Sequence, residues 1–179
     1  MNHASQNPPL IWITGFSGAG KTTIAKALIA HAKENTVHPV WLDGDRMRAA
    51  LDQTAQFDHA SRLKLGLTYA RLAKEINAQG FWVIVSTISM FDEVFEWNRD
   101  NFPNYLEVFL DVPEVVRKAR DPKGIYREHP ESMAVQAVTA DKPHAHLVLN
   151  NDGSRIPSAI AQDIWQATIA KYPLPQQKQ

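Results

Sequence analysis

Cysteine is absent from the 179-residue sequence, which excludes disulfide bonds, cysteine-ligated zinc and thiol catalysis. An excess of one charge sign is also lacking, because 19 Lys and Arg balance 19 Asp and Glu. A broad surface for nucleic acid or for an anionic membrane is therefore not expected. No apolar run reaches the ~18 residues of a membrane span, and residues 1–9 lack the apolar core of a signal peptide. These absences favour a cytoplasmic protein in which any phosphate or other anion is recognised at a confined site.

The distribution of apolar residues predicts an α/β protein. A chain of this length with 44% hydrophobic residues can bury one full core but is short for two. Near-continuous apolar runs alternate with helical patterns, which indicates a three-layer sandwich around a mainly parallel five-stranded sheet. The expected strands are 10–14, 39–43, 81–86, 105–112 and 146–150. The expected helices are 21–33, 61–79, 94–101, 113–120 and 157–171.

Three segments lack such a pattern. Residues 121–143 carry prolines, charges and small side chains, and a structureless stretch of this length in a compact domain is usually a functional loop. We interpret it as a lid. Residues 1–9 and the Pro- and Gln-rich residues 172–179 are expected to be flexible, which leaves a single domain over 10–171.

The segment GFSGAGKTT matches the phosphate-binding pattern G-x-x-x-x-G-K-[ST] in full and lies between an expected strand and an expected helix. Its glycines let backbone N–H groups converge on a phosphate, and the helix N-terminus adds a favourable dipole. Lys21 is expected to neutralise the β- and γ-phosphate oxygens of ATP, and Thr22 to ligate Mg²⁺. A chance Gly-rich turn is the alternative. The expected nucleotide-binding residues are Gly15, Phe16, Ser17, Gly18, Ala19, Gly20, Lys21, Thr22 and Thr23.

The rest of the sequence favours a small-molecule kinase among P-loop proteins. A GTPase would carry a late guanine-reading [NT]-K-x-D segment, which is absent, and a motor ATPase needs more elements than 179 residues provide. The segment DGDRMR follows an expected strand, where open α/β sheets bind ligands. One of Asp43 and Asp45 would orient Mg²⁺ or its water, and the other would accept the proton of an attacking hydroxyl. Arg48 would bind an anion of the acceptor, although Asp-Gly-Asp is also an ordinary turn.

Four motifs in this order resemble the adenylylsulfate (APS) kinase family. The segments GFSGAGKTT, DGDRMR, VSTIS and RDPKGIY correspond to that family's G-x-S-G-A-G-K-[ST], D-G-D-x-x-R, I-S-P-[YF]-R and R-D-P-K-G-[LI]-Y. The match runs from about residue 10 to 150. The resemblance implies a P-loop kinase that moves the γ-phosphate of Mg·ATP to the 3′-hydroxyl of a nucleoside 5′-phosphate derivative such as adenylylsulfate. It also implies a homodimer.

The resemblance implies roles for individual residues. Asp45 matches the family residue near the attacking hydroxyl, which leaves Asp43 for the metal. Ser89 matches a serine described as a phosphoserine intermediate; because in-line transfer needs no covalent step, we expect Ser89 to hydrogen-bond a phosphate or a Mg²⁺ ligand. Arg120 and Lys123 lie at the hinge of the expected lid, where closure would bring positive charge to the phosphoryl group. A solvated run of charges is the alternative.

The acceptor side departs from the family pattern F-S-x-x-D-R-x-x-N-x-R-R. Phe57 and Arg62 are retained, as a ring to stack on a base and a guanidinium to bind an anion. The family's Asn and two Arg positions are Leu65, Leu67 and Thr68 here. Losing a charge-assisted contact typically costs about 1.5–3 kcal/mol of binding free energy. These three positions therefore leave open the hypothesis that the acceptor is a nucleotide other than adenylylsulfate.

The stretch STISMFDEVFEWNRDNFPNYLEVFLDVP, which includes Ile88 and Ser89 of the expected acceptor site, is similar to a particular sub-branch of the family. This sub-branch is associated with bacterial surface polysaccharides and includes cytidine diphosphoramidate kinases. A cytidine nucleotide with a terminal group less acidic than sulfate is therefore the second acceptor hypothesis. A third hypothesis, from another class, is a non-catalytic ATP-binding regulator that uses the same loop.

Overall fold

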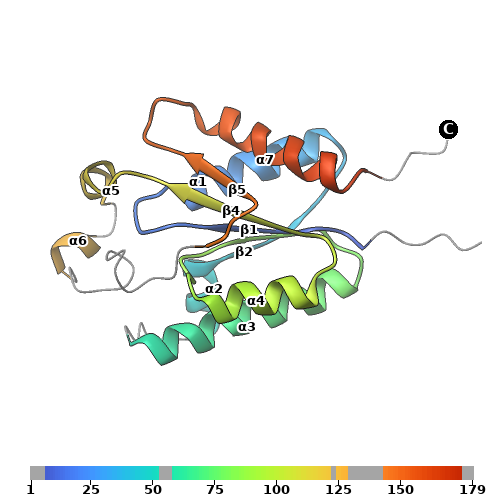
Figure 1. Ribbon diagram of the computed structural model, residues 1–179, viewed down its shortest axis with the longest axis horizontal. Helices are drawn as coiled ribbons and strands as arrows, with labels where there is room; N and C mark the ends of the chain where they lie inside the picture. The colour runs from blue at the N-terminus through green and yellow to red at the C-terminus, as the bar shows by residue number, and fades with distance from the viewer. Residues whose placement is uncertain (1–6, 53–57, 122–123, 129–142, 175–179) are drawn as a thin grey trace, which may run out of the picture.

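The protein, seen in a computed structural model, has one sheet between two layers of helices (Figure 1). The structure describes residues 7–52, 58–121, 124–128 and 143–174. Within these residues the sheet has five strands in the order β2-β3-β1-β4-β5, and all neighbouring strands are parallel. The strands are β1 (Leu10–Thr14), β2 (Val40–Asp43), β3 (Val83–Ser86), β4 (Tyr105–Asp111) and β5 (Leu147–Asn150). The predicted three-layer α/β fold is therefore confirmed.

Helices cover both faces of the sheet. α1 and α7 lie on one face, whereas α3 and α4 lie on the other, and α5 and α6 lie beside the carboxyl end of β4 (Figure 1). None of the helices in the described part of the chain has the length and apolar character of a transmembrane span. The helices are α1 (Lys21–Glu34), α2 (Gly44–Ala50), α3 (His59–Ala78), α4 (Asp92–Asn101), α5 (Glu114–Arg120), α6 (Ile125–Glu128) and α7 (Pro157–Lys171).

The central strand β1 contributes to the apolar core on both faces of the sheet. Successive side chains of a strand point to opposite faces. Ile11 and Ile13 therefore pack in the cluster beneath α1 and α7, whereas Leu10 and Trp12 pack in the cluster beneath α3 and α4. All five residues of β1 are buried. A strand covered on both faces needs apolar residues at every position, which explains the continuous apolar run in the sequence.

Two short helices lie where the sequence predicted none. α2 begins directly after β2, and the side chain of Asp43 caps it by accepting hydrogen bonds from two of its backbone N–H groups. α6 lies inside 121–143, the segment expected to lack secondary structure. Neither helix is long enough to show a helical period in the sequence. The rest of the expected lid, at 122–123 and 129–142, lies outside the described residues.

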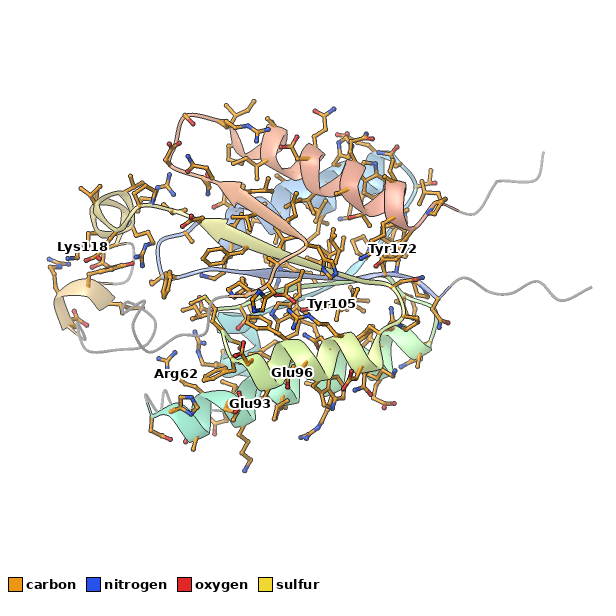
Figure 2. The ribbon with its side chains drawn as sticks, viewed as in Figure 1. Arg62, Glu93, Glu96, Tyr105, Lys118 and Tyr172 are labelled. Atoms are coloured by element: carbon orange, nitrogen blue, oxygen red, sulfur yellow. The ribbon has the colours of Figure 1, made fainter. Side chains whose placement is uncertain are left out.

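The chain after α7 contacts the sheet at the end opposite to the carboxyl ends of the strands (Figure 2). The hydroxyl of Tyr172 donates a hydrogen bond to the carbonyl oxygen of Tyr105, with 2.9 Å between the oxygens. Residues 1–6 and 175–179 lie outside the described residues. The predicted flexibility of the two ends, and the domain boundaries drawn from it, stay predictions.

Candidate nucleotide-binding and catalytic site

The candidate site lies at the carboxyl ends of β1, β2 and β3. β1 and β3 are neighbours, but the helices α1 and α4 that follow them lie on opposite faces of the sheet (Figure 1). Open α/β sheets bind ligands outside the strand ends at such a switch point. The segments after the two strands meet there, because the Thr14 hydroxyl donates to the carbonyl oxygen of Ile88 at 2.8 Å. The strand order thus brings the phosphate loop and the segment after β3 together.

All three glycines of the phosphate loop have conformations that other residues rarely adopt, including Gly15 with a φ of 150°. Gly18 has a φ of 75° and Gly20 a φ of 88°. A Cβ atom at Gly18 would lie 2.7 Å from the carbonyl oxygen of Arg117, and one at Gly20 would lie 2.5 Å from Nδ2 of Asn151. These glycines are therefore required by the backbone and by the elements behind the loop, in addition to any approach of a phosphate.

The lysine of the motif lies across the loop. Nζ of Lys21 donates hydrogen bonds to the carbonyl oxygens of Gly15, at 2.9 Å, and Phe16, at 2.8 Å. Phe16 and Ser17 are buried, whereas Thr22 and Thr23 at the start of α1 are exposed. Lys21 thus lies within reach of a phosphate held by the loop.

A hydrogen-bonded group of oxygens joins α1 to β2 and β3. The Thr22 hydroxyl donates to Oδ2 of Asp43 at 2.9 Å, and the Ser86 hydroxyl donates to the same oxygen at 2.8 Å. The indole N–H of Trp41 donates to Ser86 Oγ at 3.0 Å. A carboxylate and a hydroxyl in contact beside a phosphate loop are the oxygen ligands that Mg²⁺ prefers. Thr22 and Asp43, the predicted metal ligands, are therefore brought together and fit that ion.

The two aspartates of DGD have different surroundings. Asp43 is 5% exposed, and its Oδ1 accepts the backbone N–H groups of Asp45, at 3.2 Å, and Arg46, at 3.4 Å. The side chain of Asp45 is 44% exposed and forms an ion pair with Arg48 one turn further along α2. The buried carboxylate is thus fixed by the fold, whereas the second one is accessible to a substrate.

Two arginines of the predicted acceptor site lie near each other. Burial holds the pKa of Arg62, on α3, below its usual value, and the positive charge of Arg48 lowers it further. An anion bound beside both guanidinium groups would offset the repulsion between them and favour the charged form of Arg62. Figure 2 shows Arg62 at the end of the molecule where the strands end. Arg48, which pairs with Asp45, is thus close enough to Arg62 to act on it electrostatically.

Positions 65, 67 and 68 of α3, where the family pattern has Asn and two Arg, carry no cation in this chain. Leu65 and Leu67 are partly buried against the core cluster beneath α3 and α4. The hydroxyl of Thr68 donates to the carbonyl oxygen of Lys64 in its own helix, at 2.9 Å. This part of α3 therefore presents apolar side chains where the family pattern has polar and cationic ones.

The segment after β3 is held close to α3. Ser89 is 9% exposed, and its Oγ lies 3.0 Å from the Oγ1 of Thr87, with which it shares a hydrogen bond. A Cβ atom at Gly66 of α3 would lie 3.1 Å from the Cβ of Ser89, so the helix and this segment are in close contact. Ser89 and Ile88 therefore lie between the phosphate loop and α3, where an acceptor nucleotide is expected.

The structure adds three residues that the sequence analysis missed. Nδ2 of Asn151, after β5, donates to the carbonyl oxygen of Ala19 at 2.8 Å. Arg117 and Tyr126 contact the phosphate loop from α5 and α6. Tyr126 belongs to the RDPKGIY motif, which is a sequence signal, whereas Arg117 and Asn151 have none.

The remaining predicted residues are Arg120, Phe57 and Lys123. Nη1 of Arg120 lies 3.4 Å from the carbonyl oxygen of Gly18, to which it donates a hydrogen bond. Arg120 is therefore beside the phosphate loop. Phe57 and Lys123 lie outside the described residues, and their roles stay predictions.

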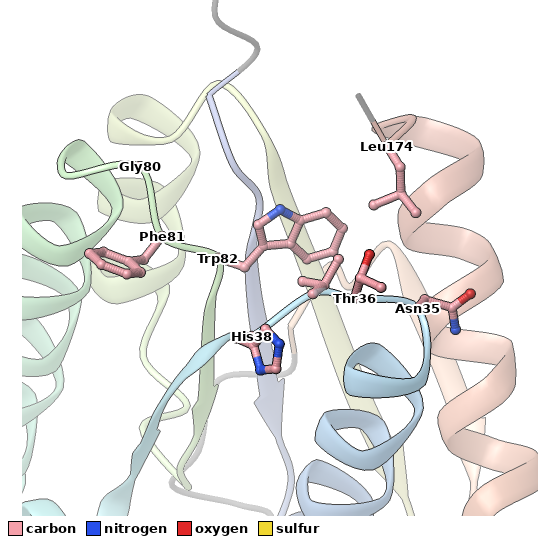
Figure 3. A pocket seen from close by; sticks show the side chains of 8 residues that line it. Asn35, Thr36, His38, Gly80, Phe81, Trp82 and Leu174 are labelled. Atoms are coloured by element: carbon pink, nitrogen blue, oxygen red, sulfur yellow. The ribbon is translucent and has the colours of Figure 1, made fainter. Parts of the chain in front are cut away.

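A separate hollow of about 480 Å³ lies at the opposite end of the sheet (Figure 3). The loops before β2 and β3 form it together with Leu174, and none of the side chains that line it is a Lys, Arg, Asp or Glu. A triphosphate requires cations or a cradle of backbone N–H groups, so this hollow does not suit one. Its lining residues are Asn35, Thr36, Val37, His38, Gly80, Phe81, Trp82 and Leu174.

Known proteins resemble this chain along most of its length. The family model described as adenylylsulphate kinase matches residues 7–144. Cytidine diphosphoramidate kinase of Campylobacter jejuni is 40% identical over 151 residues, which cover 81% of this chain and 87% of that protein. Adenylyl-sulfate kinase of Pseudomonas aeruginosa is 39% identical over 125 residues, which cover 69% of this chain and 64% of that protein.

A solved structure supports the same comparison. The APS kinase of Mycobacterium tuberculosis, in complex with AMPPNP and APS, matches the fold with a TM-score of 0.79. Its sequence is 27% identical, and the match covers 89% of this chain and 96% of that one. The likeness therefore extends from the motifs to the arrangement of the whole domain.

Proposed function

Because this chain belongs to the adenylylsulphate kinase family, we propose that it transfers the γ-phosphate of ATP to the 3′-hydroxyl of a nucleoside 5′-phosphate derivative. The observation that carries the proposal is the placement of Lys21, Thr22, Asp43 and Asp45 at one end of the sheet. A donor site and an accessible carboxylate thereby lie side by side. The resemblance seen in the four motifs is confirmed at the level of the family.

The donor half of the proposed mechanism uses the phosphate loop. Backbone N–H groups of residues 15–22 bind the β-phosphate, and the Lys21 ammonium compensates the charge that develops on the β–γ bridging oxygen and on the γ-phosphate oxygens. Thr22 and Asp43 would hold Mg²⁺, which would neutralise negative charge on the nucleotide phosphates. The hydrogen bonds of Ser86 and of the backbone to Asp43 orient that carboxylate.

The acceptor half uses the side chains on α2 and α3. The 3′-hydroxyl oxygen forms a bond to the γ-phosphorus while the bond from that phosphorus to the β–γ bridging oxygen breaks, and the hydroxyl proton passes to the Asp45 carboxylate. Arg48 and Arg62 bind the 5′-phosphate groups of the acceptor, which their proximity supports. Ser89 hydrogen-bonds a phosphate from the opposite side. No covalent enzyme intermediate is required.

We propose cytidine diphosphoramidate, in place of adenylylsulfate, as the acceptor. The apolar Leu65 and Leu67 support this choice, because they stand where the family pattern has groups suited to a strongly anionic nucleotide. The similarity to the Campylobacter jejuni kinase along most of both chains supports it independently. The terminal phosphoramidate has an NH2 group, a hydrogen-bond donor, where the sulfate has an oxygen acceptor, so it needs fewer cationic donors from the protein.

Incubating the protein with Mg·ATP and each acceptor in turn tests this proposal. We expect kcat/KM for cytidine diphosphoramidate to exceed that for adenylylsulfate by roughly 10- to 100-fold, because one or more charge-assisted contacts are missing for the latter. Phosphorus NMR and mass spectrometry identify the phosphorylated position of the product. Similar rates would contradict the choice of acceptor. If the protein binds ATP but transfers phosphate to neither acceptor, the result would contradict the proposed kinase activity and favour the hypothesis of a non-catalytic ATP-binding regulator.

Replacing Asp43 by Asn tests the metal ligand. Asn is an equally good helix cap, so α2 should be retained, but the negative charge that attracts Mg²⁺ is lost. We expect the Mg²⁺ concentration that gives half of the maximal rate to rise roughly 10- to 100-fold. The matched control is Asp100→Asn on the exposed face of α4, which should leave the Mg²⁺ dependence unchanged. An unaltered dependence in Asp43→Asn would remove this residue from the metal site.

The homodimer implied by the family resemblance stays part of this proposal. Light scattering on the purified protein measures its mass directly. A mass of one chain, 20.1 kDa, at the concentrations used for activity would contradict it.

A further inference from the structure

A cluster of aromatic rings around a buried guanidinium lies behind the phosphate loop. Arg117, on α5, is 4% exposed. Its guanidinium carbon lies 4.4 Å from the centre of the Phe16 ring and 5.8 Å from the centre of the Tyr126 ring. Nε donates to the carbonyl oxygen of Val112 at 3.0 Å, and Nη1 donates to the Tyr126 hydroxyl at 2.7 Å. Phe16 of the phosphate loop and Tyr126 of α6 thus both contact the Arg117 side chain of α5.

Tyr126 continues this set of contacts into the phosphate loop. Its hydroxyl donates to the carbonyl oxygen of Ser17 at 2.9 Å, and its own backbone N–H donates to Oδ2 of Asp121 at 3.2 Å. The Tyr126 hydroxyl can donate only one hydrogen bond, and Arg117 donates to it, so the direction of the chain from guanidinium to hydroxyl to loop carbonyl is determined. The carbonyl of Ser17 is thereby held toward α6.

The neighbouring backbone adds a second constraint. Gly18 approaches the backbone of Arg117 so closely that a Cβ atom there would lie 2.7 Å from its carbonyl oxygen. The loop segment formed by Phe16, Ser17 and Gly18 therefore contacts α5 or α6 at each of its three residues. Because the N–H groups of a phosphate loop bind only when they converge, a change in these contacts alters the affinity for phosphate.

From this geometry we infer that Arg117 is a positioning residue for ATP binding. It holds Phe16 by stacking and Ser17 through Tyr126, so that the loop is in the phosphate-binding conformation before the nucleotide arrives. The planar guanidinium is essential to this role, since a lysine ammonium neither stacks on two rings in the same way nor donates in a fixed fork. The inference rests on the proposed function in taking ATP as the ligand of the loop.

Binding of Mg·ADP to three variants, measured by isothermal titration calorimetry, tests the inference without any acceptor. We expect Arg117→Lys to raise the Kd for Mg·ADP roughly tenfold. Tyr126→Phe and Phe16→Leu, which remove the hydroxyl and the ring, should each raise it roughly threefold. The matched control is Lys118→Ala, the next residue of α5, whose side chain is 56% exposed and pairs with Glu114; its Kd should equal that of the parent protein.

Steady-state kinetics separates positioning from a general structural role. In Arg117→Lys we expect KM for ATP to rise about tenfold, with kcat and the KM for the acceptor unchanged within about twofold. Equal Kd values for Mg·ADP in the parent and Arg117→Lys proteins would overturn the inference, as would an equal rise in both KM values. If Arg117→Lys does not fold, unchanged Kd values in both Tyr126→Phe and Phe16→Leu would overturn it. Failure of phosphoryl transfer in the parent protein would contradict the proposed function alone, because the ADP measurement does not depend on it.

Discussion

Lys21→Ala is expected to lower kcat/KM for ATP-dependent phosphorylation by about 10³-fold or more. The ammonium lies at the loop that is proposed to hold the β-phosphate, and in the present structure it donates to two carbonyl oxygens of that loop. Removing one preorganised donor to a developing oxyanion typically costs 10²- to 10³-fold in rate, and here a full positive charge is removed as well. The measurement is the initial rate of product formation with saturating acceptor.

Lys26→Ala is the matched control for this experiment. Lys26 lies on the exposed face of the same helix, α1, so the same loss of charge and side chain occurs away from the loop. Its activity should equal that of the parent protein within about twofold. Thermal unfolding of both variants shows whether the loss of the two loop hydrogen bonds in Lys21→Ala also unfolds the domain. A folded Lys21→Ala protein that retains a tenth of the parent activity would contradict the role given to this lysine.

Asp45→Asn is expected to lower kcat by about 10²- to 10⁴-fold, the usual contribution of a general base. The amide keeps the shape of the carboxylate but does not accept the proton of the 3′-hydroxyl. Because the Asp45 side chain pairs with Arg48 on the same helix, α2, and the phosphate loop provides the proposed ATP site, the Kd for Mg·ATP should change by no more than about twofold. Rapid-quench kinetics and calorimetry measure the two quantities separately.

Asp52→Asn is the control for Asp45→Asn. Asp52 is exposed just after α2 and has a φ of 50°, a conformation that Asn tolerates as well as Asp. It should leave both kcat and the Kd for Mg·ATP unchanged. A normal kcat in Asp45→Asn would show that another group, or solvent, accepts the proton, and would move the proposed catalytic role away from α2.

Much of the fold was predictable because its signals are local and long. The run at residues 10–13 is apolar at every position, as a strand covered on both faces requires, and its short length before a glycine-rich turn favours a strand over a helix. The helix α3 is long enough to show its buried face in the sequence. The helices α2 and α6 have seven and four residues, which is too short for a helical period, so their presence depends on capping and on packing.

The candidate site was predictable only where a motif carries it. The residues of the phosphate loop and the DGD segment occupy consecutive positions, so their chemistry is visible in one short stretch. Arg117 and Asn151 act on the same loop from positions about 100 or more residues later. A lone arginine on an amphipathic helix or an asparagine after a strand has many ordinary explanations, and no local pattern distinguishes these two.

The sequence by itself determined that the chain forms a parallel sheet with a phosphate-binding turn after its first strand, since apolar periodicity and glycine spacing are properties of neighbouring residues. Tertiary structure alone decided which of two aspartates is buried against Thr22 and Ser86 and which is accessible. It also decided that α5 and α6 hold the outer side of the loop. The physical reason is that burial and hydrogen bonding between distant segments depend on the strand order, which places β3 and β4 on either side of β1 and which no local pattern contains.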